Sequence, residues 1–195
     1  MTIAAPLVPD RFSIITIAAS GAQSPAWNAR LRWPSYGDEH VALDDGARRG
    51  IWAAQLDAAV MRADRAVVLV AEGLGCHAAS WWARLSPRAY VSRVAGALLF
   101  DPAEGGGGPR DVFASPAVAL PFPSLVLAGD AATAPASAID GWGARLIAGH
   151  RQRADEQRPW RTAQRLIGRV TARMVDRDVE RVLALNPLAR GTDRP

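Results

Sequence analysis

The chain has 195 residues, 49% of them hydrophobic, and a formal net charge of +4. That length predicts one globular domain, and the sequence shows neither an apolar run of about 18 residues that would span a membrane nor the pattern of a secretory signal. The single cysteine, Cys76, excludes an internal disulfide and favours the reducing cytoplasm.

Apolar runs alternate with helical spacings along most of the chain. Strands are predicted over 12–18, 66–70, 94–100 and 125–128, with shorter ones over 40–43 and 144–147. Helices are predicted over 50–61 and 74–85, and a long one over about 159–183. This alternation predicts an α/β fold with a doubly wound, mostly parallel sheet, whose ligands bind at the carboxyl ends of the strands.

The most informative segment is 71–76, which reads Ala-Glu-Gly-Leu-Gly-Cys between the predicted strand 66–70 and the predicted helix 74–85. In α/β-hydrolases, a sharp turn of the pattern small-x-Ser-x-Gly lifts the nucleophile above the sheet. The small residues of that pattern are present here, but Gly73 occupies the serine position. The turn therefore lacks an attacking side chain.

Together these segments resemble the small serine hydrolases of the retinoblastoma-binding-protein and YdeN type, a compact α/β-hydrolase family. The resemblance spans about residues 12–172 and rests on segments 24–27, 52–57, 67–76, 115–124 and 142–150, with Trp160 beyond them. It implies an α/β-hydrolase-like three-layer sandwich with a mostly parallel sheet over 1–174. A C-terminal helical extension and tail, 175–195, is expected to belong to the same domain.

The resemblance also implies where a catalytic triad would lie. The family's serine falls at Gly73 and its catalytic histidine at His150, either as a base or as a relic. The triad carboxylate falls at Ala132, and Asp130 lies one or two positions early, as a possible displaced acid. The residue before the nucleophile, a histidine in the family, is Glu72.

An oxyanion hole needs backbone donors rather than particular side chains, so it can be retained when the catalytic triad is lost. The resemblance places these donors at the N–H of Leu74 and in the loop around Ser20 and Gly21, with Glu72 beside the same pocket. The sequence thus predicts a catalytically impaired serine-hydrolase homologue, a pseudoenzyme that binds a small ligand or a protein partner.

Two alternatives stay open. One is an active carboxylesterase-type hydrolase, in which Cys76 or a water activated by His150 replaces the serine. Cys76 at a helix N-terminus would be activated by the helix dipole, although packing against the sheet is the favoured interpretation. His77 and Ser80 are interpreted as packed or solvated residues, and His40 as a surface residue without a partner.

The other alternative is an oligomeric interaction module. All 23 basic residues are arginine, which with the many alanines indicates a GC-rich bacterial genome. Twelve of the arginines lie within 145–195, and from 161 to 181 they recur at every fourth residue. An amphipathic helix packed on the domain explains most of this pattern, and its protruding turns would form a homodimer contact.

Other classes of partner are not favoured. No nucleic-acid-binding motif accompanies the arginines, and acidic residues dilute the stripe from 173 to 181. Three separated histidines and one cysteine predict no metal cluster, and no cofactor is expected.

Overall fold

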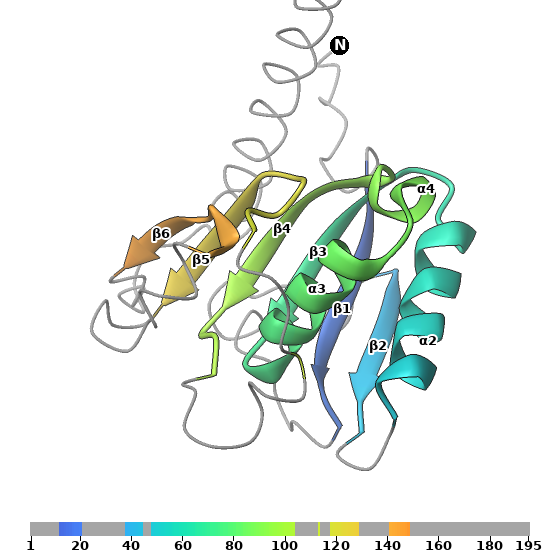
Figure 1. Ribbon diagram of the computed structural model, residues 1–195, viewed down its shortest axis with the longest axis horizontal. Helices are drawn as coiled ribbons and strands as arrows, with labels where there is room; N and C mark the ends of the chain where they lie inside the picture. The colour runs from blue at the N-terminus through green and yellow to red at the C-terminus, as the bar shows by residue number, and fades with distance from the viewer. Residues whose placement is uncertain are drawn as a thin grey trace, which may run out of the picture.

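The computed structural model describes residues 12–20, 38–44, 48–103, 113, 118–128 and 141–148. These residues form one sheet with the strand order β2-β1-β3-β4-β5-β6, in which every neighbouring pair runs parallel (Figure 1). The strands are β1 Phe12–Ala19, β2 Glu39–Leu43, β3 Ala66–Glu72, β4 Val94–Phe100, β5 Ser124–Ala128 and β6 Arg145–Ala148. The helices are α2 Arg49–Arg62, α3 Leu74–Leu85 and α4 Arg88–Val91.

The α/β fold class and the parallel sheet predicted from the sequence are confirmed. Helix α3 and strand β4 have the predicted bounds, and the other predicted elements within the described residues shift by one or two residues at their ends. Helix α4, a single turn that begins after Pro87, was not predicted from the sequence. The Arg93 side chain, just beyond α4, donates to the carbonyls of Val60 and Ala63 and so ties this turn to the end of α2.

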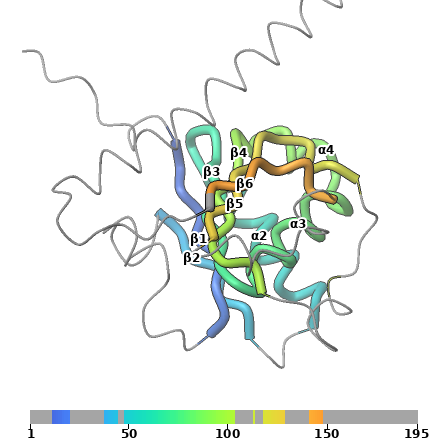
Figure 2. The backbone as a smooth tube through the Cα atoms, turned by 90° about the vertical axis from the view of Figure 1, so that its left-hand side faces the viewer, coloured from blue at the N-terminus to red at the C-terminus, as the bar shows by residue number. Residues whose placement is uncertain are grey.

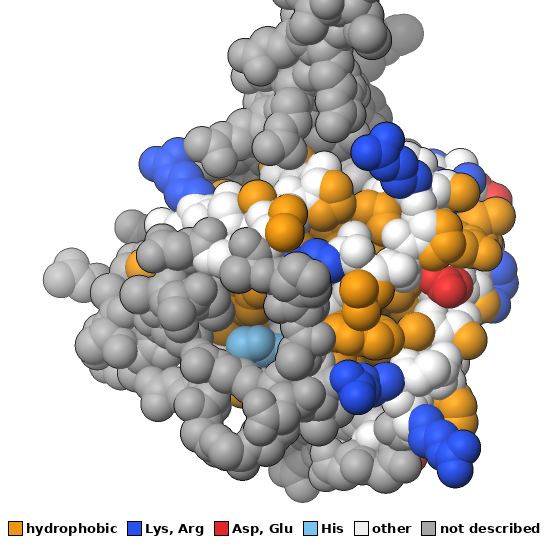
Figure 3. All heavy atoms as spheres, viewed as in Figure 1, with side chains coloured by type: hydrophobic (Ala, Val, Ile, Leu, Met, Phe, Trp, Pro, Cys, Tyr) orange, Lys and Arg blue, Asp and Glu red, His pale blue; other side chains and the backbone are white. Residues whose placement is uncertain are grey.

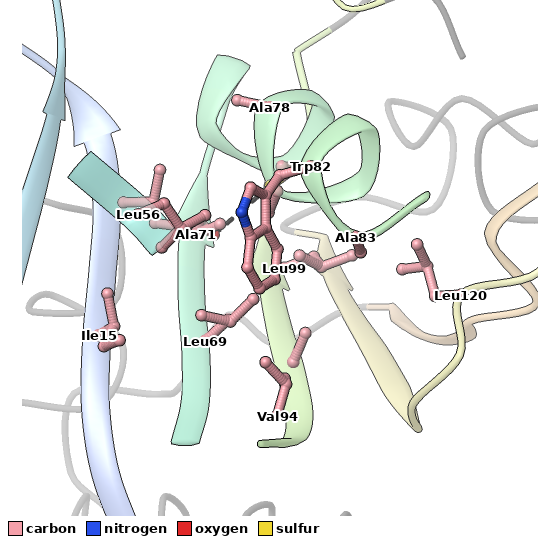
Figure 4. Packing of buried hydrophobic residues seen from close by; sticks show 14 of the residues in the cluster. Ile15, Leu56, Leu69, Ala71, Ala78, Trp82, Ala83, Val94, Leu99 and Leu120 are labelled. Atoms are coloured by element: carbon pink, nitrogen blue, oxygen red, sulfur yellow. Dashed lines mark hydrogen bonds between the residues drawn. The ribbon is translucent and has the colours of Figure 1, made fainter. Parts of the chain in front are cut away.

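The described helices lie together on one face of the sheet (Figure 2). At the centre of that layer Trp82 of α3 is fully buried, and it lies over β3 and β4 near Leu69 and Leu99 (Figure 4). Its Nε1–H donates to Asp57 Oδ1 of α2 over 2.8 Å, so the two helices are joined across the core.

The strand residues that face the opposite side of the sheet are apolar and buried as well. They are Phe12, Ile14, Ala18, Val68, Val70, Ala95, Leu98, Phe100, Leu125 and Leu127. Burial on both faces is typical of parallel sheets and explains why these strands read as continuous apolar runs. The third layer of the predicted sandwich, the helix over 159–183 and the extension 175–195 lie outside the described residues.

No helix among the described residues is long and apolar enough to cross a membrane.

Candidate functional site

The strand order reverses at β1 and β3, which marks the place where a doubly wound sheet binds its ligands. The chain leaves β1 for β2 at the edge and then returns past β1 to β3. In such sheets the crevice outside the carboxyl ends of the two strands at the reversal receives the ligand. Ser20 follows β1 at this point, Glu72 is the last residue of β3, and Gly73 follows it.

Gly73 forms the turn between β3 and α3, with φ 55° and ψ −117°. Its N–H donates to the carbonyl of Phe100 over 3.0 Å, and its carbonyl accepts from Cys76 (3.3 Å) and Ala103 (3.2 Å). These dihedrals fall outside the regions open to residues with a Cβ, where a side chain would add strain of about 1–3 kcal/mol. Gly73 therefore adopts without strain a turn that a residue with a Cβ would adopt only under strain.

The position that the missing side chain would occupy is open toward the described residues. Apart from the chain neighbours Glu72 and Leu74, none of the described residues has an atom within 4 Å of a Cβ built on Gly73. Gly75, two residues on, is the opposite case, because a Cβ there would lie 2.6 Å from the carbonyl oxygen of Ile17 in β1. The first glycine thus leaves a vacant position, and the second permits α3 to approach β1 closely.

The backbone N–H of Leu74 begins α3 next to this vacant position. The first N–H groups of a helix have no acceptor within it, and Gly73 offers no side chain to cap them. Together with the positive end of the helix dipole, this N–H favours a partly negative oxygen. An N–H at the start of a helix is of the kind that an oxyanion hole uses, and this role of Leu74 stays a prediction.

Ser20, the other described residue of the expected oxyanion loop, has a different environment. Its backbone N–H donates to the carbonyl of Leu43 over 2.7 Å, and the residue is exposed. That N–H is therefore used to extend the pairing of β1 with β2 and does not serve as an oxyanion donor. Gly21 lies outside the described residues.

Two carboxylates flank the elbow. Glu72 is the last residue of β3 and is half-buried, and Asp101 follows β4, the neighbouring strand. The backbone of Asp101 has a positive φ of 38°, and its N–H donates to the carbonyl of Leu127 over 2.9 Å. Asp101 was not predicted as a site residue, although its place directly after the predicted strand 94–100 could have indicated it.

The structure places Cys76 in the core rather than at the site. Its side chain is fully buried, and Sγ donates to the carbonyls of Ala71 and Phe100, each over 3.4 Å. Burial, and then the charge of Glu72 nearby, raises the pKa of the Cys76 thiol well above its usual value. The neutral, enclosed thiol matches the packed interpretation and argues against a cysteine nucleophile.

His77 and Ser80 are also packed, as expected. The Nε2 atom of His77 lies 3.0 Å from the carbonyl oxygen of Ala103, and its ring meets Trp142 edge-on with centroids 5.3 Å apart. Ser80 Oγ donates to the carbonyl of Cys76 over 2.8 Å. Ala103 also donates its N–H to Gly73, so His77 helps to hold the loop after β4 against the elbow.

The interpretation of His40 as a surface residue without a partner was wrong. His40 is half-buried, and its Nδ1 lies 2.9 Å from Thr16 Oγ1. The two residues are direct neighbours in the β1–β2 pairing, so their side chains share one face of the sheet. Burial lowers the pKa of His40.

His150, Asp130 and Ala132 lie outside the described residues, so their assignment to a triad stays a prediction. Strands β5 and β6, whose carboxyl ends precede these positions in sequence, are both present in the sheet. Within the described ranges no group of three or more histidine, cysteine, aspartate or glutamate side chains is arranged to hold a metal ion.

A family model described as "Serine hydrolase" matches residues 25–167, which is well over half of the chain. The chain belongs to the serine hydrolase family. Its fold is similar to that of a solved YdeN-like hydrolase from Pectobacterium atrosepticum, with a TM-score of 0.58 and 16% sequence identity over 85% of this chain and 93% of the other. No curated protein sequence matches significantly.

Because the chain belongs to the serine hydrolase family, its β3–α3 turn can be compared with the nucleophile elbow of that family. The fold, the β3–α3 turn and the N–H of Leu74 follow the pattern of a serine hydrolase elbow. Gly73 lies in this turn, and its assignment to the position of the family's serine stays a prediction.

Proposed function

We propose that this serine hydrolase family member binds a neutral carbonyl compound, such as an ester or amide, at the Gly73 elbow without hydrolysing it efficiently. The observation that carries the proposal is the backbone of Gly73. Its φ of 55° and ψ of −117° form a turn that strains any residue with a Cβ, and no described atom beyond the two chain neighbours lies within 4 Å of where a Cβ would project.

The loss of the nucleophile is decisive for the rate. Acyl transfer by this family needs an attacking atom, a base and an orienting carboxylate. Removing the serine from such a triad lowers turnover on the order of a millionfold and leaves what binding and the oxyanion donors supply. A histidine or a carboxylate elsewhere at the site does not restore the missing atom.

The charges around the elbow favour a neutral ligand. The N–H of Leu74 and the positive end of α3 attract the oxygen of a carbonyl group. Glu72 ends β3 and Asp101 follows the neighbouring strand β4, and the charges of both residues raise the pKa of the Cys76 thiol. The same two charges repel a bound carboxylate, so an ester or amide fits better than a free acid.

The alternative is an active hydrolase in which another group replaces the serine. That group would be either a cysteine or an activated water. A cysteine nucleophile has little support, because Cys76 is enclosed in the core and its thiol is neutral. A water held in the vacant position and activated by His150 is the other version, and a kinetic assay separates it from the proposal.

The assay measures hydrolysis of 4-nitrophenyl acetate and 4-nitrophenyl butyrate by the purified full chain. The proposal predicts the same near-background rate for the native protein and for His150→Ala. A substantial rate that is lost in His150→Ala would overturn the proposal in favour of the activated-water mechanism.

Binding is tested by ligand-observed NMR with short-chain ethyl esters and, as the charged comparison, butyrate. Leu74→Pro removes the proposed donor at the first helical position, where proline is well tolerated. Leu74→Ala is the matched control, since it shortens the same side chain and keeps the N–H. We expect the native protein and Leu74→Ala to bind the esters, and Leu74→Pro to lose binding. Failure of the native protein to bind any of these esters would overturn the binding proposal.

A further inference from the structure

The carbonyl of Gly73 and the N–H of Leu74 belong to one peptide group, so the direction of one sets the direction of the other. Every peptide bond among the described residues is trans. In a trans peptide the carbonyl and the N–H point in opposite directions. A contact that fixes the Gly73 carbonyl therefore also directs the N–H of Leu74, which is the donor that the proposed function requires.

Two backbone N–H groups bond to the Gly73 carbonyl. One belongs to Cys76 in the first turn of α3 (3.3 Å), and the other belongs to Ala103 in the loop after β4 (3.2 Å). A residue with a Cβ has few φ and ψ values open to it, whereas glycine has many. The direction of this peptide group therefore depends on its hydrogen bonds, and of these two bonds the one from Ala103 comes from outside α3.

His77 bonds to the same residue, Ala103, through the Ala103 carbonyl. Its Nε2 lies 3.0 Å from that oxygen. A carbonyl oxygen only accepts, so Nε2 carries the hydrogen in this contact. His77 is 9% exposed, so water competes little for the bond. The backbone of Ala103 thus donates to Gly73 and accepts from His77, and it connects the histidine ring to the elbow.

The His77 ring is itself packed against the segment before β6. It meets the buried Trp142 edge-on, with an interplanar angle of 66° and ring centroids 5.3 Å apart. Arg84, further along α3, donates to the carbonyl of Gly141 over 2.6 Å and so joins this segment to the helix. The edge contact limits the orientations open to the ring. The Nε2 atom therefore stays directed at Ala103.

We propose that His77 is a positioning residue for ligand binding at the elbow. By bonding to Ala103 it fixes the Gly73 carbonyl, and so it keeps the N–H of Leu74 directed at the oxygen of a bound ester or amide. This inference rests on the proposed function, because it concerns the affinity for the same ligand. His77 acts through the backbone of Ala103 rather than by contact with the ligand.

Two substitutions at position 77 separate this role from packing alone. His77→Phe keeps an aromatic ring beside Trp142 and removes the donor. His77→Gln keeps an N–H donor at the end of the side chain and removes the ring. The proposal predicts that His77→Phe is impaired and that His77→Gln is close to native, whereas a packing role predicts the reverse order.

A control variant is available on the same helix. Apolar side chains are exposed at several places on the face that α3 covers (Figure 3), and Leu85, the last residue of α3, is 55% exposed. Leu85→Ala changes this surface at the end of the helix remote from Gly73, so it should leave the elbow unaffected. All three variants should keep the far-UV CD spectrum of the native chain.

The first measurement is the exchange of the Ala103 amide hydrogen with solvent deuterium, followed by NMR of the full chain. We expect exchange about tenfold faster in His77→Phe, because Ala103 loses one of its two hydrogen bonds there. His77→Gln and Leu85→Ala should exchange at the native rate. In the native chain, a proton–nitrogen spectrum of the imidazole ring should show a hydrogen on Nε2 of His77.

The second measurement is the dissociation constant for ethyl butyrate, obtained by ligand-observed NMR titration. We expect it to rise about tenfold in His77→Phe and to keep the native value in His77→Gln and Leu85→Ala.

Three outcomes would overturn the inference. They are native exchange and native affinity in His77→Phe, an Nε2 without hydrogen in the native chain, and an equal effect of Leu85→Ala on both quantities. Failure of the native chain to bind ethyl butyrate is a different result, because it contradicts the proposed function. Faster Ala103 exchange in His77→Phe would then still support the role of His77 in fixing the backbone of the elbow.

Discussion

Gly75 lies so close to Ile17 that a Cβ on the glycine would be 2.6 Å from the carbonyl oxygen of Ile17. The start of α3 therefore approaches β1 as closely as a backbone without a side chain permits. This approach sets the position of the Leu74 N–H and of the vacant Gly73 beside the crevice between β1 and β3. The geometry of the site depends on it.

We predict that Gly75→Ala destabilises the protein by about 1–3 kcal/mol, as is usual for overpacking in a core. The added methyl meets a backbone carbonyl, which moves only if the sheet or the helix moves with it. Thermal unfolding followed by CD measures the effect, and each kcal/mol corresponds to about 2–4 °C in Tm for a chain of this size. An unchanged Tm would show that α3 does not pack against β1 as described.

We predict that Gly73→Ala lowers the stability by about 1–3 kcal/mol for a different reason, the strain of placing a Cβ at a φ of 55°. The matched control is Gly50→Ala, which lies in the first turn of α2, has open space and has no positive φ. In a helix that change is expected to stabilise by about 0.5–1 kcal/mol. Equal effects of the two substitutions in urea unfolding would contradict the elbow conformation.

We predict that Cys76 does not react with a thiol reagent such as DTNB in the native protein at pH 8. The side chain is fully buried and its pKa is raised, so neither access nor a thiolate is available. Reaction is expected after unfolding in guanidinium chloride. Val118→Cys is the positive control, because position 118 is exposed and its thiol should react at once. Rapid reaction of one thiol in the native protein would contradict this prediction and support a cysteine nucleophile.

We predict that His40 makes stability depend on pH below about 6.5, its usual pKa. Burial lowers its pKa in the folded state, so the unfolded chain binds more protons as the pH falls below that value. Stability is therefore full above pH 6.5 and declines as the pH falls toward the lowered pKa. His40→Gln keeps a hydrogen-bonding side chain beside Thr16 and removes the titration. Urea unfolding of both proteins from pH 7.5 to 5 should give a flatter profile for the variant, and identical profiles would count against a buried His40.

The sequence could predict the sheet because its strands are buried on both faces and appear as uninterrupted apolar runs, as in 94–100. The start of α3 could also be predicted, because Gly73 and Gly75 follow an apolar run and match the small residues of a strand-to-helix elbow. The environments of His40 and Asp101 could not be predicted in the same way. His40 meets Thr16 only through the register of β1 and β2, and Asp101 reaches the elbow only because β4 lies beside β3.

The same limit applies to the oxyanion donors. The N–H of Leu74 follows from its place at the start of a helix, which a sequence pattern can reveal. The use of the Ser20 N–H by Leu43 follows from a pairing between strands that are separated by the segment 20–38. Contacts of this kind depend on the folded sheet and leave no local pattern.

We propose that the absence of a side chain at Gly73 removes covalent chemistry from a serine hydrolase elbow. Intact-mass spectrometry after incubation with a fluorophosphonate probe tests this proposal most directly. We expect the native chain to keep its unmodified mass while an active serine hydrolase in the same reaction is fully labelled. A covalent adduct on any residue of the native chain would contradict it.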